Sequence, residues 1–238
     1  MAAELKLIAG GGPDAPSGQG NSFPGLPGEK GTHSADGRGV ASPRGPSTIP
    51  SSGNGPPPLQ LQGRNTLVEL FATPRDGGWI GFLLAQLPPG KPWLWVQQRM
   101  AVLEAGRLYP PGLGAGAGGL IHVVASDPRD ALWAMEEGLR CPALGAVIGE
   151  LHGDPAALDF TATRRLAVAA ERSGVAAFLI RLGGQPNLSG ARLRWRVASA
   201  ASLANPFNPR APGLPAWEAE LFRTRFGRPG RWLLSHEP

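Results

Sequence analysis

The chain contains little cysteine, little lysine and no long hydrophobic run. Cys141 is the single cysteine among 238 residues, which excludes an intrachain disulfide framework and fits a reducing cytoplasm. No apolar run reaches 18 residues, and the N-terminus lacks a basic segment followed by an apolar one, so we expect no membrane span and no signal peptide. The four histidines are isolated from other ligand types. We therefore expect no metal site and no cofactor.

Glycine and proline are abundant instead, and they are unevenly spread. Residues 1–60 contain 13 glycines and 10 prolines, and after residue 8 they offer almost nothing apolar to bury. Such a segment cannot offset the conformational entropy lost on ordering. We expect a disordered tail over residues 1–63 and a folded domain over residues 64–238.

Residues 125–181 predict the fold class. Asp127 followed by Pro128 is a strong helix start, and Ala131, Leu132, Met135 and Leu139 then form one helical face. A second helix brings Leu158, Ala162, Leu166 and Ala169 inward and ends at Gly174. Fully apolar strands follow each helix, at Ala146–Ile148 and Val175–Ile180. Apolar strands alternating with amphipathic helices indicate an α/β fold, with a mostly parallel sheet covered on both faces.

The flanking segments extend this sheet. Further strands are expected at Thr66–Ala72, Pro92–Gln97 and Leu120–Ala125. At the C-terminal end, Glu218–Ser235 predicts an antiparallel β-hairpin around a Gly-Arg-Pro-Gly turn at residues 227–230. Four of the tryptophans are expected to face inward: Trp93, Trp95, Trp133 and Trp195.

The segment after the first of these strands has the position of a phosphate-binding loop but not its chemistry. Such a loop needs glycines for backbone approach, a lysine for the phosphates and a hydroxyl for Mg²⁺. The glycines here are Gly77, Gly78 and Gly81, and no Lys, Ser or Thr lies between Pro74 and Gly90. We therefore expect a degenerate loop and no nucleotide binding.

Arginine carries most of the positive charge, with a formal net charge of +5. Arg192, Arg194 and Arg196 alternate with apolar residues and share one face of a predicted strand, and Arg223 and Arg225 repeat the pattern on a second. These five residues are candidates for binding a partner protein or DNA, in which case binding would depend steeply on salt. The alternative is an edge strand that charge protects from aggregation.

Several motifs follow one another along about residues 64–238: DALWAMEEGLRC, AVIGEL, LDFTATRRLAVAAERSGV, LRWRVA and GRPGRWLL. In this order they resemble the ImuA family, whose members are RecA-like proteins encoded with error-prone polymerases in bacterial SOS mutagenesis cassettes. This resemblance implies a RecA-type core followed by a terminal antiparallel extension. It also implies that Glu150 stands near the carboxylate that helps to hold Mg²⁺ in RecA-type ATPases. The catalytic glutamate of RecA, expected just after the strand PWLWV, has no counterpart before Glu104.

The resemblance leads to two functional hypotheses. The first is a non-catalytic cytoplasmic adaptor for damage-induced translesion synthesis. Its implied partners are RecA, an ImuB-type Y-family polymerase-like protein, an error-prone C-family DNA polymerase and, as a further ligand, DNA. The alternative is an ATP-dependent RecA-type DNA-binding enzyme, which the missing lysine and hydroxyl disfavour. A third label, cell-division inhibitor, rests only on family members named as SulA-like.

Overall fold

The computed structural model describes residues 4–7, 65–113 and 119–237, which belong to one compact unit. These residues form nine strands, four α-helices and one short 3-10 helix. In chain order they are β1 (Glu4–Leu7), β2 (Leu67–Ala72), α1 (Gly78–Leu84), β3 (Trp93–Gln98), α2 (Arg99–Ala105), η1 (Pro110–Leu113), β4 (Leu120–Ala125), α3 (Pro128–Leu139), β5 (Ala146–His152), α4 (Phe160–Ser173), β6 (Ala176–Leu182), β7 (Leu193–Ala200), β8 (Ala216–Thr224) and β9 (Gly230–Glu237).

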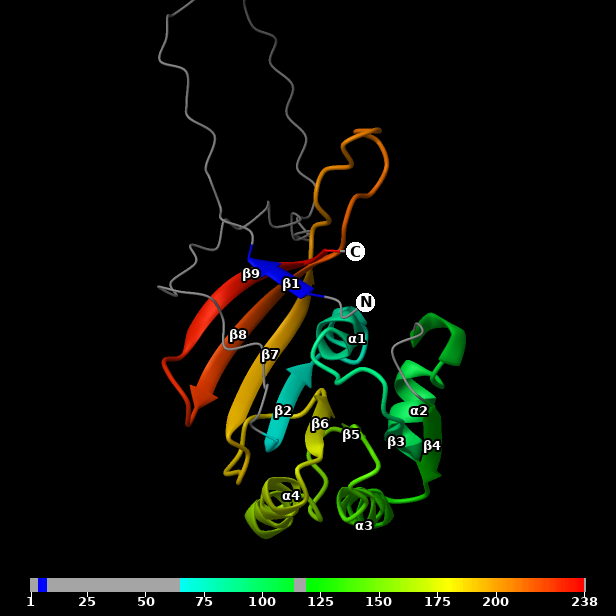
Figure 1. Cartoon of the computed structure of the whole chain (residues 1–238), viewed down its shortest axis with the longest axis vertical. Helices are drawn as coiled ribbons and strands as arrows, with labels where there is room; N and C mark the ends of the chain where they lie inside the picture. The colour runs from blue at the N-terminus through cyan, green and yellow to red at the C-terminus, as the bar shows by residue number, and fades with distance from the viewer. Residues whose placement is uncertain (1–3, 8–64, 114–118, 238) are drawn as a thin grey trace, which may run out of the picture. The chain divides into compact units, whose positions relative to one another are not determined.

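All nine strands belong to one sheet with the order β1-β9-β8-β7-β2-β6-β5-β3-β4 (Figure 1). The strands from β7 to β4 in this order pair in parallel, whereas β8, β9 and β1 extend the sheet with antiparallel pairs. The prediction of an α/β fold with a mostly parallel sheet is confirmed. The antiparallel pairing of β8 with β9 is consistent with the hairpin expected there.

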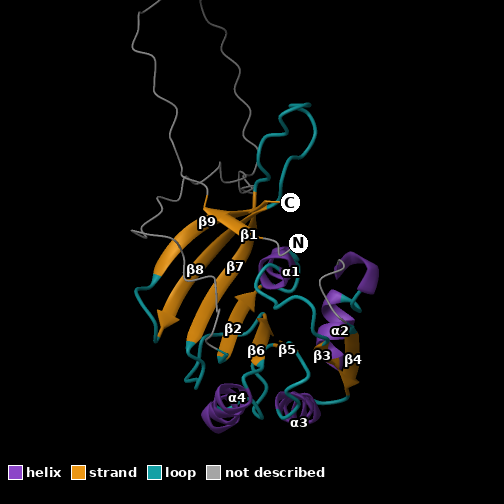
Figure 2. Ribbon diagram, viewed as in Figure 1, coloured by secondary structure: helices purple, strands orange, loops and turns teal. Residues whose placement is uncertain are grey.

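Helices cover both faces of the sheet, as Figure 2 shows. One hydrophobic core contains Trp79, Phe82 and Leu83 of α1 and Ala101 of α2, packed on the sheet. The other core lies on the opposite face, under α3 and α4. The central strands are apolar on both faces because each face is buried under helices.

The helix ends follow the expected local chemistry. Asp127 accepts hydrogen bonds from the backbone N–H groups of Arg129 and Asp130, at 2.7 and 3.0 Å, and Pro128 is the first residue of α3. Asp159 likewise accepts from Ala162, so α4 begins at Phe160 rather than at Leu158. Gly174 ends α4 in the left-handed conformation, with φ of 74°, as predicted.

Two sequence-based expectations need correction or restriction. Trp133, expected to face inward, is 63% exposed, because it follows the buried Leu132 by one helical position and is rotated about 100° from it. The expected tail over residues 1–63 lies outside the described residues, except that Glu4–Leu7 forms β1 and pairs with β9.

None of the helices in the described ranges combines the length and the apolar character that crossing a membrane requires.

Candidate functional site

The loop between β2 and α1 lies at the carboxyl ends of the parallel strands, where open α/β sheets bind ligands. Asp76 organises this loop. Its carboxylate accepts hydrogen bonds from the Gly78 N–H at 2.8 Å and from the N–H and hydroxyl of Ser199 on β7, at 2.8 and 2.5 Å. Burial by itself raises the pKa of Asp76, but the hydrogen bonds from Ser199 and Gly78 lower it below its ordinary value. The Asp76 carboxylate thus accepts a hydrogen bond from the Gly78 N–H group, which in a phosphate-binding loop would donate to the phosphate.

The predicted loop glycines serve the packing of α1. A Cβ atom on Gly78 would lie 2.5 Å from the Ser199 hydroxyl, and one on Gly81 would lie 2.5 Å from the Trp217 ring. Both glycines therefore let α1 approach β7 and β8 closely. Gly77, in contrast, has no atom within 4 Å of the Cβ position.

A cavity of about 400 Å³ lies beside this loop. Its walls include the loop itself, Trp79 of α1, Gln97 and Glu150 at the strand ends, and the segment that carries Arg107 and Tyr109. Trp79 is buried, and its ring centroid lies 6.3 Å from that of Trp95. Trp79 therefore forms one wall of the cavity next to the β2–α1 loop.

Glu150 is buried on β5 and held by neighbouring side chains. The indole N–H of Trp95 and the amide of Gln97 donate to its Oε2, at 3.3 and 3.0 Å. Burial raises the pKa of Glu150 to about 6, although the hydrogen bonds from Gln97 and Trp95 act in the opposite direction. Glu150 therefore has neutral donors rather than cations beside it, and its correspondence to a Mg²⁺-holding carboxylate stays a prediction.

Gln97 connects this carboxylate to the next strand. Its carbonyl oxygen accepts from the Leu108 N–H at 3.3 Å and lies 2.9 Å from Nε2 of His122 on β4. Since the Gln97 amide nitrogen already donates to Glu150, His122 must donate through Nε2. Burial lowers the pKa of His122, and the positive charge of Arg107 lowers it further. Both effects favour the neutral imidazole that carries its proton on Nε2.

A nucleoside triphosphate with Mg²⁺ is the ligand that the resemblance to RecA-like proteins implies here. The residues present do not fit it. The loop has neither the lysine nor the hydroxyl that hold phosphate and metal, and Asp76 places negative charge where phosphates would add more.

The structure separates the five predicted arginines. Arg194 is buried, and its guanidinium binds Glu69 at 2.6 Å, so it does not reach the surface. Arg192 and Arg196 pair with Glu171 and Glu220, at 2.7 and 2.9 Å.

Arg223 and Arg225 are exposed, and Arg225 contributes to lowering the pKa of Glu171, after the larger effect of the Arg192 hydrogen bond. The five residues therefore do not form one continuous row of free cations. A binding role for the exposed ones stays a prediction.

Sequence reasoning missed a buried charge cluster that contains Arg194. Glu69 of β2 lies between the guanidiniums of Arg194 and Arg181, the latter at 3.8 Å, and accepts from the Ser189 hydroxyl at 2.9 Å. Both guanidiniums lie over the Phe71 ring, at 5.2 and 5.3 Å from its centroid. The sequence did contain a signal for this cluster, because Glu69 in β2 and Arg181 in β6 are each the only charged residue of an otherwise apolar strand.

No family model matches the chain. It is 36% identical over 151 residues to Protein ImuA of Caulobacter vibrioides, in strain NA1000 / CB15N and equally in strain ATCC 19089 / CIP 103742 / CB 15. Each match covers 59% of this chain and 59% of the relative, so the chain spans about three fifths of the length of these curated relatives.

Proposed function

We propose that the chain, which is 36% identical to Protein ImuA of Caulobacter vibrioides over 151 residues, belongs to the ImuA family and is a non-catalytic, RecA-like accessory protein of SOS-induced mutagenesis and translesion DNA synthesis. It acts in the cytoplasm as an adaptor that brings RecA together with an error-prone polymerase complex. The mostly parallel sheet, its helices on both faces and the antiparallel strands β8 and β9 support a RecA-like core.

The observation that carries the non-catalytic part of the proposal is the β2–α1 loop. In a phosphate loop, backbone N–H groups and a lysine surround the phosphates. Here the Asp76 carboxylate ties the start of α1 to Ser199, and Gly78 and Gly81 are used in packing α1 on the sheet. These contacts favour a loop that fixes the architecture over one that opens to a nucleotide.

The adaptor part is tested by direct binding. The 238-residue protein is immobilised and exposed in turn to purified RecA, to an ImuB-type polymerase-like protein and to an error-prone C-family polymerase. We expect saturable binding to at least one of them without added nucleotide. Absence of binding to all three, by a protein shown to be folded, would contradict the adaptor function.

The exposed members of the predicted arginine set allow a refinement of this experiment. Replacing Arg223 and Arg225 by glutamate weakens binding if that end of the sheet meets an acidic partner or DNA. Unchanged affinity assigns the contact to another surface.

An ATP-dependent DNA-binding enzyme is the alternative function. The cavity at the strand ends and the position of Glu150 favour it. It predicts phosphate release from ATP that single-stranded DNA stimulates and that Glu150→Gln abolishes. The adaptor proposal predicts no release above buffer in any of these conditions.

A further inference from the structure

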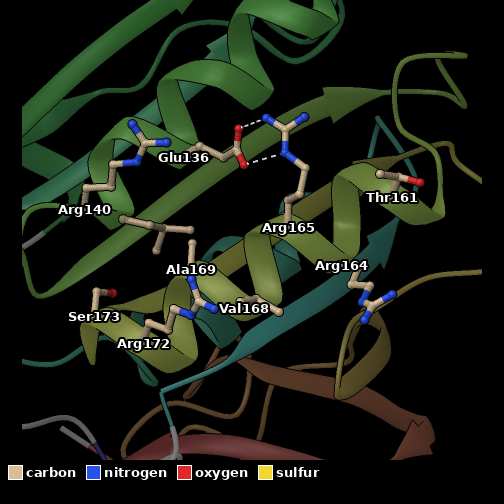
Figure 3. A pocket seen from close by; sticks show the side chains of 10 residues that line it. Glu136, Arg140, Thr161, Arg164, Arg165, Val168, Ala169, Arg172 and Ser173 are labelled. Carbon is tan, nitrogen blue, oxygen red and sulfur yellow. Dashed lines mark hydrogen bonds and ion pairs between the residues drawn. The ribbon is translucent and has the colours of Figure 1, made fainter.

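A hollow of about 660 Å³ opens between α3 and α4 (Figure 3). It shares no lining residue with the cavity beside Glu150. Leu139, Val168 and Ala169 line its apolar part. Four arginines and a single glutamate form the charged part: Arg140, Arg164, Arg165, Arg172 and Glu136. The hollow therefore combines an aliphatic strip with an excess of positive charge.

Ion pairing within the chain neutralises only part of this charge. Two guanidinium nitrogens of Arg165 on α4 donate to the two carboxylate oxygens of Glu136 on α3, as the dashed lines in Figure 3 show. Arg140 pairs with Glu137 at 2.8 Å, but both side chains are largely exposed, and such pairs are weak. Arg164 and Arg172 are exposed and make no ion pair with any residue of the described ranges.

A second hollow of about 260 Å³ continues the same surface. It shares Glu136 and Arg165 with the first, and its walls include Leu132, Leu166 and Trp133. All seven tryptophans lie in the described part of the chain, and Trp133 is the one that is exposed. Tryptophan and arginine are the residues most enriched in the energetic centres of protein interfaces.

We propose that this α3–α4 surface docks an acidic, amphipathic segment of a partner protein, with its apolar side chains on the aliphatic strip and its carboxylates on the free arginines. The inference deepens the adaptor function and rests on it. Charge complementarity identifies the occupant, because the hollow offers free guanidiniums on either side of apolar atoms.

Other occupants fit less well. Single-stranded nucleic acid is held by aromatic platforms beneath the bases, but the larger hollow is aliphatic and the only exposed indole lies in the smaller one. The chain's own N-terminal region does not supply the charge, since residues 8–64 contain three acidic residues against four lysines and arginines.

A peptide selection tests the proposal without a known partner. Random peptides displayed on phage are selected on the immobilised 238-residue protein without counter-selection, and the enriched peptides are then measured against the Arg164→Glu, Arg172→Glu double variant. The matched control is the double variant Arg210→Glu, Arg228→Glu, which makes the same charge change at exposed loop arginines. Near-ultraviolet circular dichroism establishes that all three proteins share one fold.

We expect the enriched peptides to combine Asp or Glu with Leu, Ile or Phe. Their affinity, measured by fluorescence anisotropy, falls at least tenfold in the Arg164, Arg172 variant, falls with added salt and is unchanged in the control. Bound peptide also protects Trp133 from acrylamide quenching, and Trp133→Phe removes that signal.

Enrichment of non-acidic peptides, equal affinity for both double variants, or displacement by single-stranded DNA instead of acidic peptide would overturn the inference. These outcomes concern this surface alone. Failure of the protein to bind RecA and both polymerase-type proteins concerns the adaptor function itself, so the two failures are distinguishable.

Discussion

Replacing Glu150 by glutamine tests how the buried carboxylate beside the cavity is held. Glutamine has nearly the same shape and keeps an oxygen that accepts from Trp95 and Gln97, but it cannot carry charge. The native carboxylate is 1% exposed, and both of its hydrogen-bond donors are neutral. Ionisation is therefore unfavourable in the folded state.

The size of the effect follows from the pKa. Burial raises the pKa of Glu150 from 4.5 to about 6. At about 1.36 kcal/mol per pKa unit, this rise corresponds to about 2 kcal/mol. Between pH 4.5 and 6 the folded state holds a proton that the unfolded state has released, so this group lowers the stability as pH rises through that window. Above pH 6 the whole cost is present.

The measurement is urea denaturation of the native protein and of Glu150→Gln between pH 4 and pH 7.5. We expect the stability of the variant relative to the native protein to rise by about 2 kcal/mol over this range, most of it between pH 4.5 and 6. Any constant effect of the amide group cancels, because only the change with pH is used. Glu104→Gln, at an exposed position on α2, is the matched control for replacing a carboxylate by an amide.

A flat difference over this range would contradict the reasoning. A difference of opposite sign would do so more strongly, because it would mean that Glu150 is held as an anion by a positive charge. That is the state that an ATPase would need for binding Mg²⁺.

Three further predictions concern the folded structure, and each is measured as a free energy of unfolding by urea denaturation. Asp76→Ala removes the acceptor of three hydrogen bonds at the β2–α1 loop and should lower stability by about 1–3 kcal/mol; an effect below the error would refute the role given to this carboxylate. Gly81→Ala places a methyl group against Trp217 and should cost about 1–3 kcal/mol, whereas Gly77→Ala, which meets no atom, should not share this cost; equal effects would contradict the packing role. Glu69→Ala leaves two buried guanidiniums without their shared carboxylate and should cost about 3–5 kcal/mol, and a neutral result would contradict the buried cluster.

The parts of the fold that could be predicted are those that local sequence determines. Strands such as β5 and β6 carry mostly apolar residues on both faces. The start of α3 is marked by two adjacent residues, Asp127 at the N-cap and Pro128 at the first helical position. The helix α2 was not predicted, because it is seven residues long and buries only Ala101, which leaves no periodic pattern.

The contacts that could not be predicted join distant segments. Arg194 lies 125 positions from Glu69, and Ser199 lies 123 positions from Asp76. The alternation of residues around Arg194 correctly predicted that Leu193 and Trp195 share one face of the strand. It did not indicate that Arg194, on the other face, binds the buried carboxylate of Glu69. Pairing across a sheet depends on strand order, which local pattern does not encode.

Titration calorimetry of the protein with ATP and Mg²⁺, with and without single-stranded DNA, tests the non-catalytic function most directly. RecA in the same buffer is the positive control. We expect only the heat of dilution in both conditions, because Asp76 engages the start of α1 and the loop lacks a lysine. Saturable binding at micromolar ATP would contradict this and would mean that the loop at Gly77, Gly78 and Gly81 opens to a nucleotide.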